Sequence, residues 1–158
     1  MIRHGVYPCP LGTLVIGHTD AKIVSVKLES ETNLSHRPSP LSDLAAGQIM
    51  EYFQGKRKDF DLPIYAPGTP FQMAVWHEIS RIPYGQTRNY GQIAAILGKP
   101  KAARAVGQAA NRNPLWILIP CHRVVGKNGN LTGYAGGLTM KQTLLELEQL
   151  HKNSPEAP

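Results

Sequence analysis

The sequence has no long apolar run and very little cysteine. No apolar stretch approaches the roughly 20 residues that a helix needs to span a bilayer, and the N-terminus lacks the unbroken apolar segment of a signal peptide. Cys9 and Cys121 are the only cysteines, which excludes a disulfide framework, a four-cysteine zinc site and a C-x-x-C motif. These absences predict a reduced, cytoplasmic, globular protein with no membrane partner and no bound metal.

Acidic residues are scarce only in the second part of the chain. Residues 1–66 contain seven Lys and Arg and seven Asp and Glu, whereas residues 67–158 contain ten Lys and Arg and four Asp and Glu. The net charge of +6 therefore comes from the second part. This imbalance is typical of a lobe that binds a polyanion, although a basic surface that serves solubility explains it equally well.

The first part predicts a small β-sheet lobe with one helix, ending near residue 66. Apolar residues that alternate with polar ones predict strands over residues 4–9, 12–19 and 22–28. Apolar residues at helical spacing predict a helix over residues 41–55. A linker is expected to follow, because three consecutive positive charges and two prolines lie in the segment from Lys56 to Gly68.

The second part predicts a helical lobe over residues 67–152, followed by a disordered tail over residues 153–158. Helices are predicted over residues 70–82, 90–97, 101–111 and, after a cap at Thr139, to about residue 151. The first, second and last of these helices each begin with Thr or Asn followed three residues later by Gln, the pattern of a capping box. The short turn Gly98-Lys99-Pro100 between the second and third helices is typical of a helix-turn-helix.

The helix predicted over residues 101–111 combines small residues with a cationic face. Its apolar side chains recur at helical spacing and are expected to face the core: Ala102, Ala105, Val106, Ala109 and Ala110. The cations Lys101, Arg104 and Arg112 are expected to project elsewhere. A helix with such small side chains can lie close to another surface, which is either a DNA groove or a neighbouring helix.

An apolar run leads to Cys121, which follows Pro120 and precedes His122 and Arg123. A cysteine in such a run is usually an inert core thiol, because burial raises its pKa and suppresses the nucleophilic thiolate. Here His122 places a potential base, and Arg123 a fixed positive charge, next to the sulfur in the chain. The residues alone leave a reactive thiol and a core thiol open. The reactive thiol requires a sulfur that is accessible and ionisable, with an imidazole in reach.

Motifs over about residues 70–148 resemble a single family in its order and spacing. They are Tyr84-Gly85, Asn89-Tyr90-Gly91-Gln92-Ile93-Ala94, Ala102-Ala103-Arg104-Ala105-Val106-Gly107, Asn113-Pro114, Pro120-Cys121-His122-Arg123-Val124 and Gly133-Tyr134-Ala135-Gly136-Gly137-Leu138. Together they resemble the O6-alkylguanine-DNA alkyltransferases (methylated-DNA–protein-cysteine methyltransferases). The resemblance implies an α+β fold, in which an RNase H-like sheet lobe with one helix precedes a helical lobe with a winged-helix-like helix-turn-helix.

The resemblance implies DNA repair by one irreversible transfer of an alkyl group from O6-alkylguanine, and more weakly O4-alkylthymine, to Cys121. It implies double-stranded DNA as the partner, bound through the minor groove, with the damaged nucleotide flipped out of the duplex. No cofactor is expected, because the damaged base itself is the alkyl donor. The protein is expected to be a monomer in solution, and cooperative loading on DNA stays open.

The resemblance also assigns catalytic roles. Cys121 is the nucleophile, and His122 is the base, which acts through a bridging water. Glu148 orients and stabilises that histidine, as in a nucleophile–base–orienter triad. Asn113 braces the active-site turn. Tyr90 crowds the adjacent phosphate and hydrogen-bonds the extruded base, and it is the candidate proton donor to the leaving guanine.

A DNA-binding surface and an alkyl pocket complete the expected site. The DNA-binding residues are Arg104, Tyr90, Gly91, Lys99, Ala103 and Lys127. Arg104 matches the arginine that fills the gap left by the flipped base, and Lys99 and Lys127 are phosphate contacts by charge and placement. The pocket residues are Trp116, Tyr134, Ala135 and Gly136. Trp116 stands where many relatives carry proline, which predicts a narrower pocket that favours methyl over benzyl, and Ala135 replaces a serine of some relatives.

Three other functions compete with repair. A non-catalytic sensor of alkylation damage shares this architecture but replaces the cysteine, whereas Cys121 is present. A transcriptional regulator of this family carries an additional cysteine-rich zinc domain, which these 158 residues lack. A cysteine hydrolase would need an oxyanion site and turnover, and it would leave the helix-turn-helix without a use.

Overall fold

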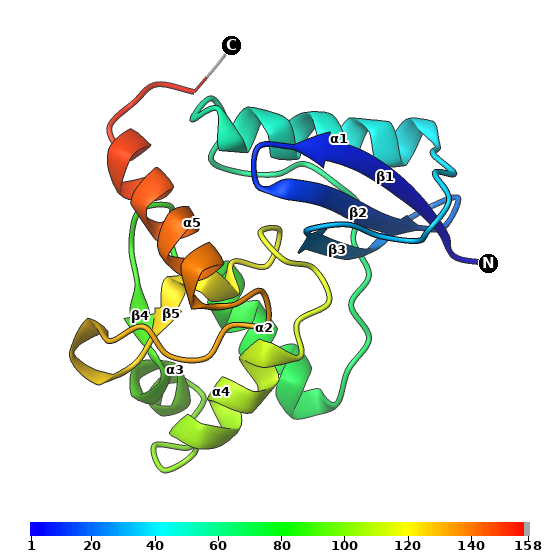
Figure 1. The fold of residues 1–158 in the computed structure, drawn as a ribbon. Helices are drawn as coiled ribbons and strands as arrows, with labels where there is room; N and C mark the ends of the chain where they lie inside the picture. Colours follow the sequence, from blue (N-terminus) through cyan, green and yellow to red (C-terminus); the bar gives the residue numbers. More distant parts are fainter. Residues whose placement is uncertain (157–158) are drawn as a thin grey trace. The chain divides into compact units, whose positions relative to one another are not determined.

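A computed structural model describes residues 1–156, which form two compact units (Figure 1). The first unit comprises Met1–Ala66, Pro114–Leu118 and the described residues from Asn153. The second comprises Pro67–Asn113 and Ile119–Lys152. The first contains an antiparallel sheet with one helix and the second is mainly helical, so the predicted α+β class is confirmed. Of the tail expected to be disordered, residues 157 and 158 lie outside the described residues.

Three antiparallel strands build the sheet of the first unit, in the order β1 (Arg3–Cys9), β2 (Gly12–His18) and β3 (Ile23–Glu29). The central strand β2 is buried from Leu14 to His18. The turn before β2 requires glycine at Gly12, where φ is +123° and a Cβ would lie 2.6 Å from the carbonyl oxygen of Glu29. The three predicted strands are confirmed, with each boundary shifted by at most one residue.

Helix α1 (Pro40–Phe53) packs against this sheet (Figure 1). Ser39 caps it by accepting a hydrogen bond from the backbone N–H of Ser42. Ala45, Ile49 and Tyr52 recur at helical spacing and are fully buried, so they form the core of this unit together with the side chains of β2.

The segment Pro114–Leu118 joins the same sheet next to β3. The backbone N–H of Trp116 donates to the Val26 carbonyl at 3.1 Å. Ile117 then adopts a φ of 72°, and the N–H of Leu118 donates to the Trp116 carbonyl at 2.8 Å, which closes a three-residue turn. A positive φ is an outlier for a β-branched residue, so this turn is strained where the chain leaves the sheet.

The α-helices described in the second unit are α2 (Pro70–Ser80), α3 (Tyr90–Ile96), α4 (Ala103–Asn111) and α5 (Leu138–His151). The capping boxes predicted for α2 and α3 are confirmed, with Thr69 pairing with Gln72 and Asn89 with Gln92. Gly98, at a φ of 74°, ends α3 and opens the turn to α4. The two helices contact each other, as a helix-turn-helix requires.

The prediction that Thr139 caps the last helix is wrong. Helix α5 begins one residue earlier, at Leu138, and Gly137 occupies the cap position with no side-chain hydrogen bond. Gly137 has a φ of 92°, a backbone conformation that the sequence pattern does not reveal. Thr139 lies inside the helix, and its carbonyl accepts a hydrogen bond from the hydroxyl of Thr143.

One residue of α4 also differs from its prediction. Val106, Ala109 and Ala110 are buried as expected, whereas Ala105 is exposed. The buried face of this short helix is therefore narrower than the spacing of its alanines indicated. As a result, Ala105 and Arg104 both belong to the exposed side of the helix.

Four short elements were not predicted: β4 (Arg88–Asn89), β5 (Val124–Val125), and the 3-10 helices η1 (Cys121–Arg123) and η2 (Lys127–Gly129). Two-residue strands carry no periodicity, so only tertiary pairing defines them. The parallel β4–β5 pair joins the residues that lead into α3 to those that directly follow η1. Among the described helices, none combines the length and the apolar character that crossing a membrane requires.

Candidate active site

Cys121 lies at the start of η1, directly after a tight turn. Pro120 has a φ of −81° and a ψ of 63°, and the backbone N–H of Cys121 donates to the Ile119 carbonyl at 2.8 Å. Proline suits this turn, because its ring fixes φ near this value. A 3-10 helix has about three residues per turn, so η1 sends the side chains of Cys121, His122 and Arg123 in three directions.

Asn113 holds this turn from within the second unit. Its side chain is buried, and Nδ2 donates to the Ile119 carbonyl at 2.8 Å. The same carbonyl accepts the N–H of Cys121, so one oxygen joins the Asn113 side chain to the turn that carries the sulfur. A side-chain hydrogen bond from Asn113 also lowers the pKa of the Cys121 thiol.

Glu148 is the centre of a buried polar network. His122 Nε2 lies 2.5 Å from Oε2, while Arg123 donates from Nε to Oε1 at 2.8 Å and from Nη2 to Oε2 at 3.1 Å. The backbone N–H of Gly85 donates to Oε1 at 3.0 Å. Arg123 is held further by a 2.7 Å bond from Nη1 to the Ile82 carbonyl. The carboxylate thus accepts four hydrogen bonds, which fixes its position.

The network fixes the charge state of Glu148. Burial raises the pKa of Glu148, but hydrogen bonds from His122 and Arg123, together with the positive charge of Arg123, outweigh burial and bring that pKa to about 2. Burial lowers the pKa of His122, although Glu148 opposes this shift. At neutral pH the network therefore pairs a carboxylate with a neutral imidazole. An ionised carboxylate only accepts, so His122 Nε2 carries the proton that they share.

Burial limits both the accessibility and the ionisation of the Cys121 sulfur. Cys121 is 5% exposed, and burial raises the pKa of its thiol to about 12, against opposing effects of Asn113 and Lys141. Burial thus opposes ionisation of this sulfur. The reason is desolvation, since a thiolate loses its hydration when its surroundings are buried. Ionisation of the thiol thus depends on the charged groups around it.

Lys141 is one such group, and the sequence analysis missed it. It lies in the first turn of α5, is fully buried, and donates from Nζ to the Thr132 carbonyl at 2.7 Å. A signal was available in the sequence, because Lys141, Leu144 and Glu148 recur at helical spacing and share the buried face of α5. A lysine on the same face as a proposed catalytic carboxylate was a reason to consider it.

Tyr90 begins α3 next to the same loop. Its hydroxyl donates to the Thr132 carbonyl at 3.1 Å, and the Nζ of Lys141 lies 5.8 Å from the centre of its ring. A Cβ placed on Gly107 would lie 3.6 Å from the Tyr90 ring, so the ring packs against the backbone of α4. Tyr90 therefore connects the helix-turn-helix to the loop that precedes α5.

The residues expected to bind DNA belong to α3, α4 and the loops of the second unit. Arg104 and Lys127 are exposed, whereas Gly91 and Ala103 are half-buried in the first turns of their helices. Lys99 is exposed, and its Nζ lies 5.2 Å from the centre of the Phe71 ring.

The residues expected to form the alkyl pocket fall in different units. Tyr134 and Gly136 are half-buried and Ala135 is exposed, and all three lie in the second unit, in the loop before α5. Burial raises the pKa of Tyr134, and the nearby Cys121 raises it further. Trp116 is buried within the first unit, beside β3.

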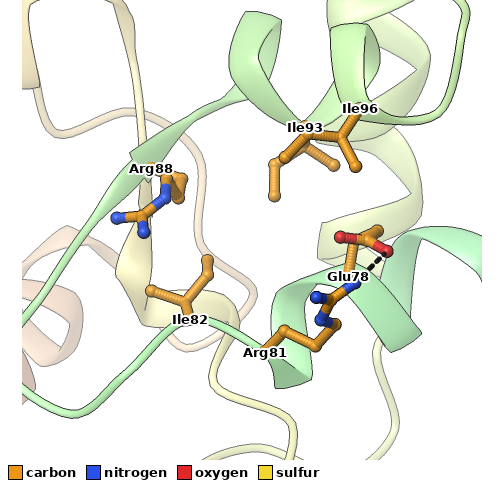
Figure 2. A pocket seen from close by; sticks show the side chains of 6 residues that line it. All are labelled: Glu78, Arg81, Ile82, Arg88, Ile93 and Ile96. Atoms are coloured by element: carbon orange, nitrogen blue, oxygen red, sulfur yellow. Dashed lines mark hydrogen bonds and ion pairs between the residues drawn. The ribbon is translucent and has the colours of Figure 1, made fainter.

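A pocket of about 300 Å³ lies elsewhere in the second unit, between α2, β4 and α3 (Figure 2). Its lining residues are Glu78, Arg81, Ile82, Arg88, Ile93 and Ile96. Figure 2 shows Arg81 joined to Glu78, an ion pair of 3.4 Å. None of the residues predicted for catalysis lines this pocket. Within residues 1–156, no three His, Cys, Asp or Glu side chains gather in an arrangement that could hold a metal ion.

Comparisons with known proteins agree on one family. Residues 2–66 match the family described as "6-O-methylguanine DNA methyltransferase, ribonuclease-like domain", and residues 70–150 match its "DNA binding domain". A "Methylated-DNA--protein-cysteine methyltransferase, constitutive" from Bacillus subtilis (strain 168) is 48% identical over 151 residues, which cover 89% of this chain and 92% of the relative.

Solved structures resemble the whole chain. The O6-methylguanine methyltransferase of Mycobacterium tuberculosis has a TM-score of 0.87 and 38% identity, covering 100% of this chain and 96% of the other. The structure of OGT from the same organism in complex with DNA has a TM-score of 0.86 and 39% identity, covering 98% of this chain and 96% of the other. Two matched domains and relatives of nearly equal length leave one assignment: the chain belongs to the 6-O-methylguanine DNA methyltransferase family.

Proposed function

We propose that this protein repairs alkylated DNA by moving the alkyl group of O6-alkylguanine to the sulfur of its own Cys121, once per molecule. The observation that carries this proposal is the buried network of His122, Arg123 and Glu148, which begins at the residue after the cysteine. Such a network holds a neutral imidazole in one orientation, as activation of a neighbouring nucleophile requires.

The proton path follows from the tautomer. Because His122 Nε2 donates its proton to Glu148, its Nδ1 is the nitrogen that can take up a proton from the thiol of Cys121. In the family this transfer passes through a bridging water. Glu148 stays ionised and stabilises the imidazolium that forms. Arg123 assists by holding the carboxylate in place with two hydrogen bonds.

The transfer is a displacement at the alkyl carbon. A new carbon–sulfur bond forms to Cys121 while the bond between the carbon and guanine O6 breaks, and the electron pair of that bond moves to the guanine. The guanine needs a hydrogen-bond donor as it leaves, and Tyr90 supplies its hydroxyl. The thioether is stable, so each molecule reacts once.

The second unit supplies the DNA-binding surface in this proposal. Its excess of cations favours DNA phosphates, and the exposed Arg104 of α4 would fill the gap that the flipped nucleotide leaves. Entry through the minor groove fits repair at any sequence, because that groove carries a degenerate code. We further propose that the protein acts as a monomer in solution and in the cytoplasm.

Mass spectrometry of the intact protein tests the proposal. Incubation with duplex DNA containing O6-methylguanine should add about 14 Da, the mass of one methylene, and peptide mapping should place it on Cys121. Cys121→Ser should abolish the addition, and the matched variant Cys9→Ser should retain it. Binding of the damaged duplex without any mass change would favour a non-catalytic sensor, and repeated release of a small product would favour a hydrolase.

Trp116 is proposed to narrow the alkyl pocket, so that methyl is transferred more readily than benzyl. The variant Trp116→Pro should then react faster with O6-benzylguanine, while its rate with O6-methylguanine DNA stays closer to that of the native protein. Equal benzylguanine rates for both proteins would remove the proposed role of Trp116.

A further inference from the structure

Lys141 is a buried cation held by backbone carbonyls. Its side chain is fully buried, and Nζ donates to the carbonyls of Thr132 at 2.7 Å and Gly133 at 3.5 Å. Burial of a lysine removes the hydration of its ammonium group, a loss that a neighbouring carboxylate usually offsets. Throughout residues 1–156, no carboxylate lies within 4.0 Å of Nζ. The ammonium is thus solvated by dipoles but has no resident anion.

The groups around Lys141 identify the anion that it can serve. Helix α5, which carries Lys141, packs against η1, which carries Cys121 and His122. In keeping with this packing, Cys121 raises the pKa of Lys141, and Lys141 lowers the pKa of both Cys121 and His122. From α3 the aromatic ring of Tyr90 faces Nζ, and from the preceding loop Tyr134 lies near Cys121.

The buried acid on α5 is already paired with other groups. Glu148 accepts hydrogen bonds from His122, Arg123 and Gly85, so its charge is taken up by other donors. Tyr90 and Tyr134 are phenols, whose ordinary pKa lies near 10. Cys121 is therefore the one group of this set that must become an anion in the proposed reaction.

We propose that Lys141 is the counter-ion of the Cys121 thiolate, a positioning residue that offsets the desolvation of the sulfur while the alkyl group is transferred. This inference rests on the proposed function of Cys121 as the alkyl acceptor. Lys141 gives up no proton in the step. The thiol proton goes to His122, the thiolate forms next to the ammonium, and the sulfur then uses its electron pair to bond the alkyl carbon.

The ammonium group of Lys141 also makes a structural contact. The carbonyl of Thr132 accepts from both Lys141 Nζ and the Tyr90 hydroxyl, so Lys141 also helps to hold the loop against which Tyr90 rests. A role confined to this loop would need a hydrogen-bond donor but no charge. The experiment must therefore separate charge from hydrogen bonding.

Three variants in a Cys9→Ser background, where Cys121 is the only thiol, make this separation. Lys141→Met removes both the charge and the donor, Lys141→Gln keeps an N–H donor without charge, and Lys141→Arg keeps the charge. Each protein is alkylated with iodoacetamide between about pH 6 and pH 10, a range that spans ordinary thiol ionisation. Thiolate formation is followed in parallel by ultraviolet absorbance, with Cys9→Ser/Cys121→Ser as the blank.

If the charge of Lys141 matters, Lys141→Met and Lys141→Gln should have similar alkylation rates. Both should lower the alkylation rate of Cys121 at neutral pH by about tenfold or more, because one pKa unit changes the thiolate population tenfold. The alkylation rate of Lys141→Arg should stay within about threefold of that of the lysine protein, which allows for repacking around a larger cation. The lysine protein should also show a break in its pH profile near the pKa of Lys141, about 8, which the other variants lack.

Two outcomes would overturn the proposal. If Lys141→Met and Lys141→Gln retain the pH profile of the lysine protein, the charge has no role. If Lys141→Gln matches the lysine protein while Lys141→Met does not, Lys141 has only a structural role. If Lys141→Met fails to fold, the comparison of Lys141→Gln with Lys141→Arg still separates charge from hydrogen bonding. These assays use no DNA, so failure of methyl transfer from a damaged duplex would count against the proposed function and not against the Lys141–Cys121 pair.

Discussion

The two units bury polar side chains for different purposes. In the first unit, His18, Ser42 and Gln48 are buried, and the side chain of each makes hydrogen bonds to backbone groups. In the second, the buried polar set is Asn113, His122, Arg123, Lys141 and Glu148. Three of these carry formal charge, and desolvation of charge is far more costly than desolvation of an amide or hydroxyl. The first unit thus uses polar groups to complete its fold, whereas the second maintains a cluster of charges around a cysteine.

The surfaces differ in the same sense. Residues 1–66 contain equal numbers of cations and acids, whereas residues 67–158 contain ten cations and four acids. One of those four acids is the buried Glu148. Arg123 and Lys141 are buried as well, so eight cations and three acids of the second part remain outside the core, and the positive excess persists at the surface. In the proposed function, the second unit therefore carries both the reacting residues and the attraction to DNA.

The largest effect is expected where a buried charge loses its partner. Glu148→Ala leaves Arg123 buried without its carboxylate and should lower the free energy of unfolding by about 3–5 kcal/mol. In the first unit, Gln48→Ala should lower the free energy of unfolding by only about 1–3 kcal/mol, because it removes the hydrogen-bond partner of neutral backbone groups of Asp61. Urea denaturation measures both. Glu146→Ala, at an exposed position of the same helix, serves as the control and should change stability by less than about 0.5 kcal/mol.

Acid pH should lower the free energy of unfolding by a somewhat smaller amount than Glu148→Ala, through protonation of the same charge cluster. The pKa of Glu148 falls from 4.5 to about 2 on folding, so its stabilisation is present above pH 4.5 and is lost as the pH falls through about 2. The loss is at most about 3 kcal/mol. His122 acts in the same direction, because burial lowers its pKa below 6.5 and the unfolded chain binds its proton more readily.

Thermal unfolding measured from neutral pH downwards tests this linkage. The native protein should lose stability steadily towards acid pH, and Glu148→Gln should flatten that dependence, since a neutral amide does not titrate. An unchanged acid dependence in the Gln variant would show that the cluster does not control the acid sensitivity of the protein.

Binding to DNA should separate the units by charge. Lys99→Ala and Lys127→Ala each remove one proposed phosphate contact, so each should reduce the slope of log affinity against log salt by about 0.9. Lys22→Ala and Lys27→Ala, in the first unit, should leave the slope unchanged. Fluorescence anisotropy with undamaged duplex DNA at several salt concentrations measures these slopes. Equal reductions in all four variants would mean that the first unit also contacts phosphates.

The smallest effects concern the helix caps, where the two units should behave alike. Ser39→Ala at α1 and Thr69→Ala at α2 each remove a side-chain cap and should cost about 1 kcal/mol. Thr139→Ala should cost less than about 0.5 kcal/mol, because Thr139 caps nothing and lies within α5. Chemical denaturation compares the three, and a loss of 1 kcal/mol at Thr139 would contradict the start of α5 at Leu138.

The helices and strands were predictable because their signals are local. Apolar alternation, capping boxes and glycine stops lie within a few residues of the elements that they define, so α1, α2, α3 and the three long strands agree with their predictions. The predictions were wrong where the deciding feature is a backbone conformation or a long-range pair. Gly137 replaces Thr139 at the start of α5, and β4 and β5 exist only by pairing with each other.

The family, the position of the cysteine and the elements on which the site is built were predictable from the sequence. The charges that surround the sulfur, in contrast, follow from the tertiary fold: Arg123 holds Glu148 in place, and Lys141 lies buried near Cys121. The physical reason is that burial and electrostatic coupling depend on distances between residues far apart in the chain, and these distances leave no periodic trace in the sequence. The pKa of the thiol, and with it the chemistry, is therefore a property of the folded second unit.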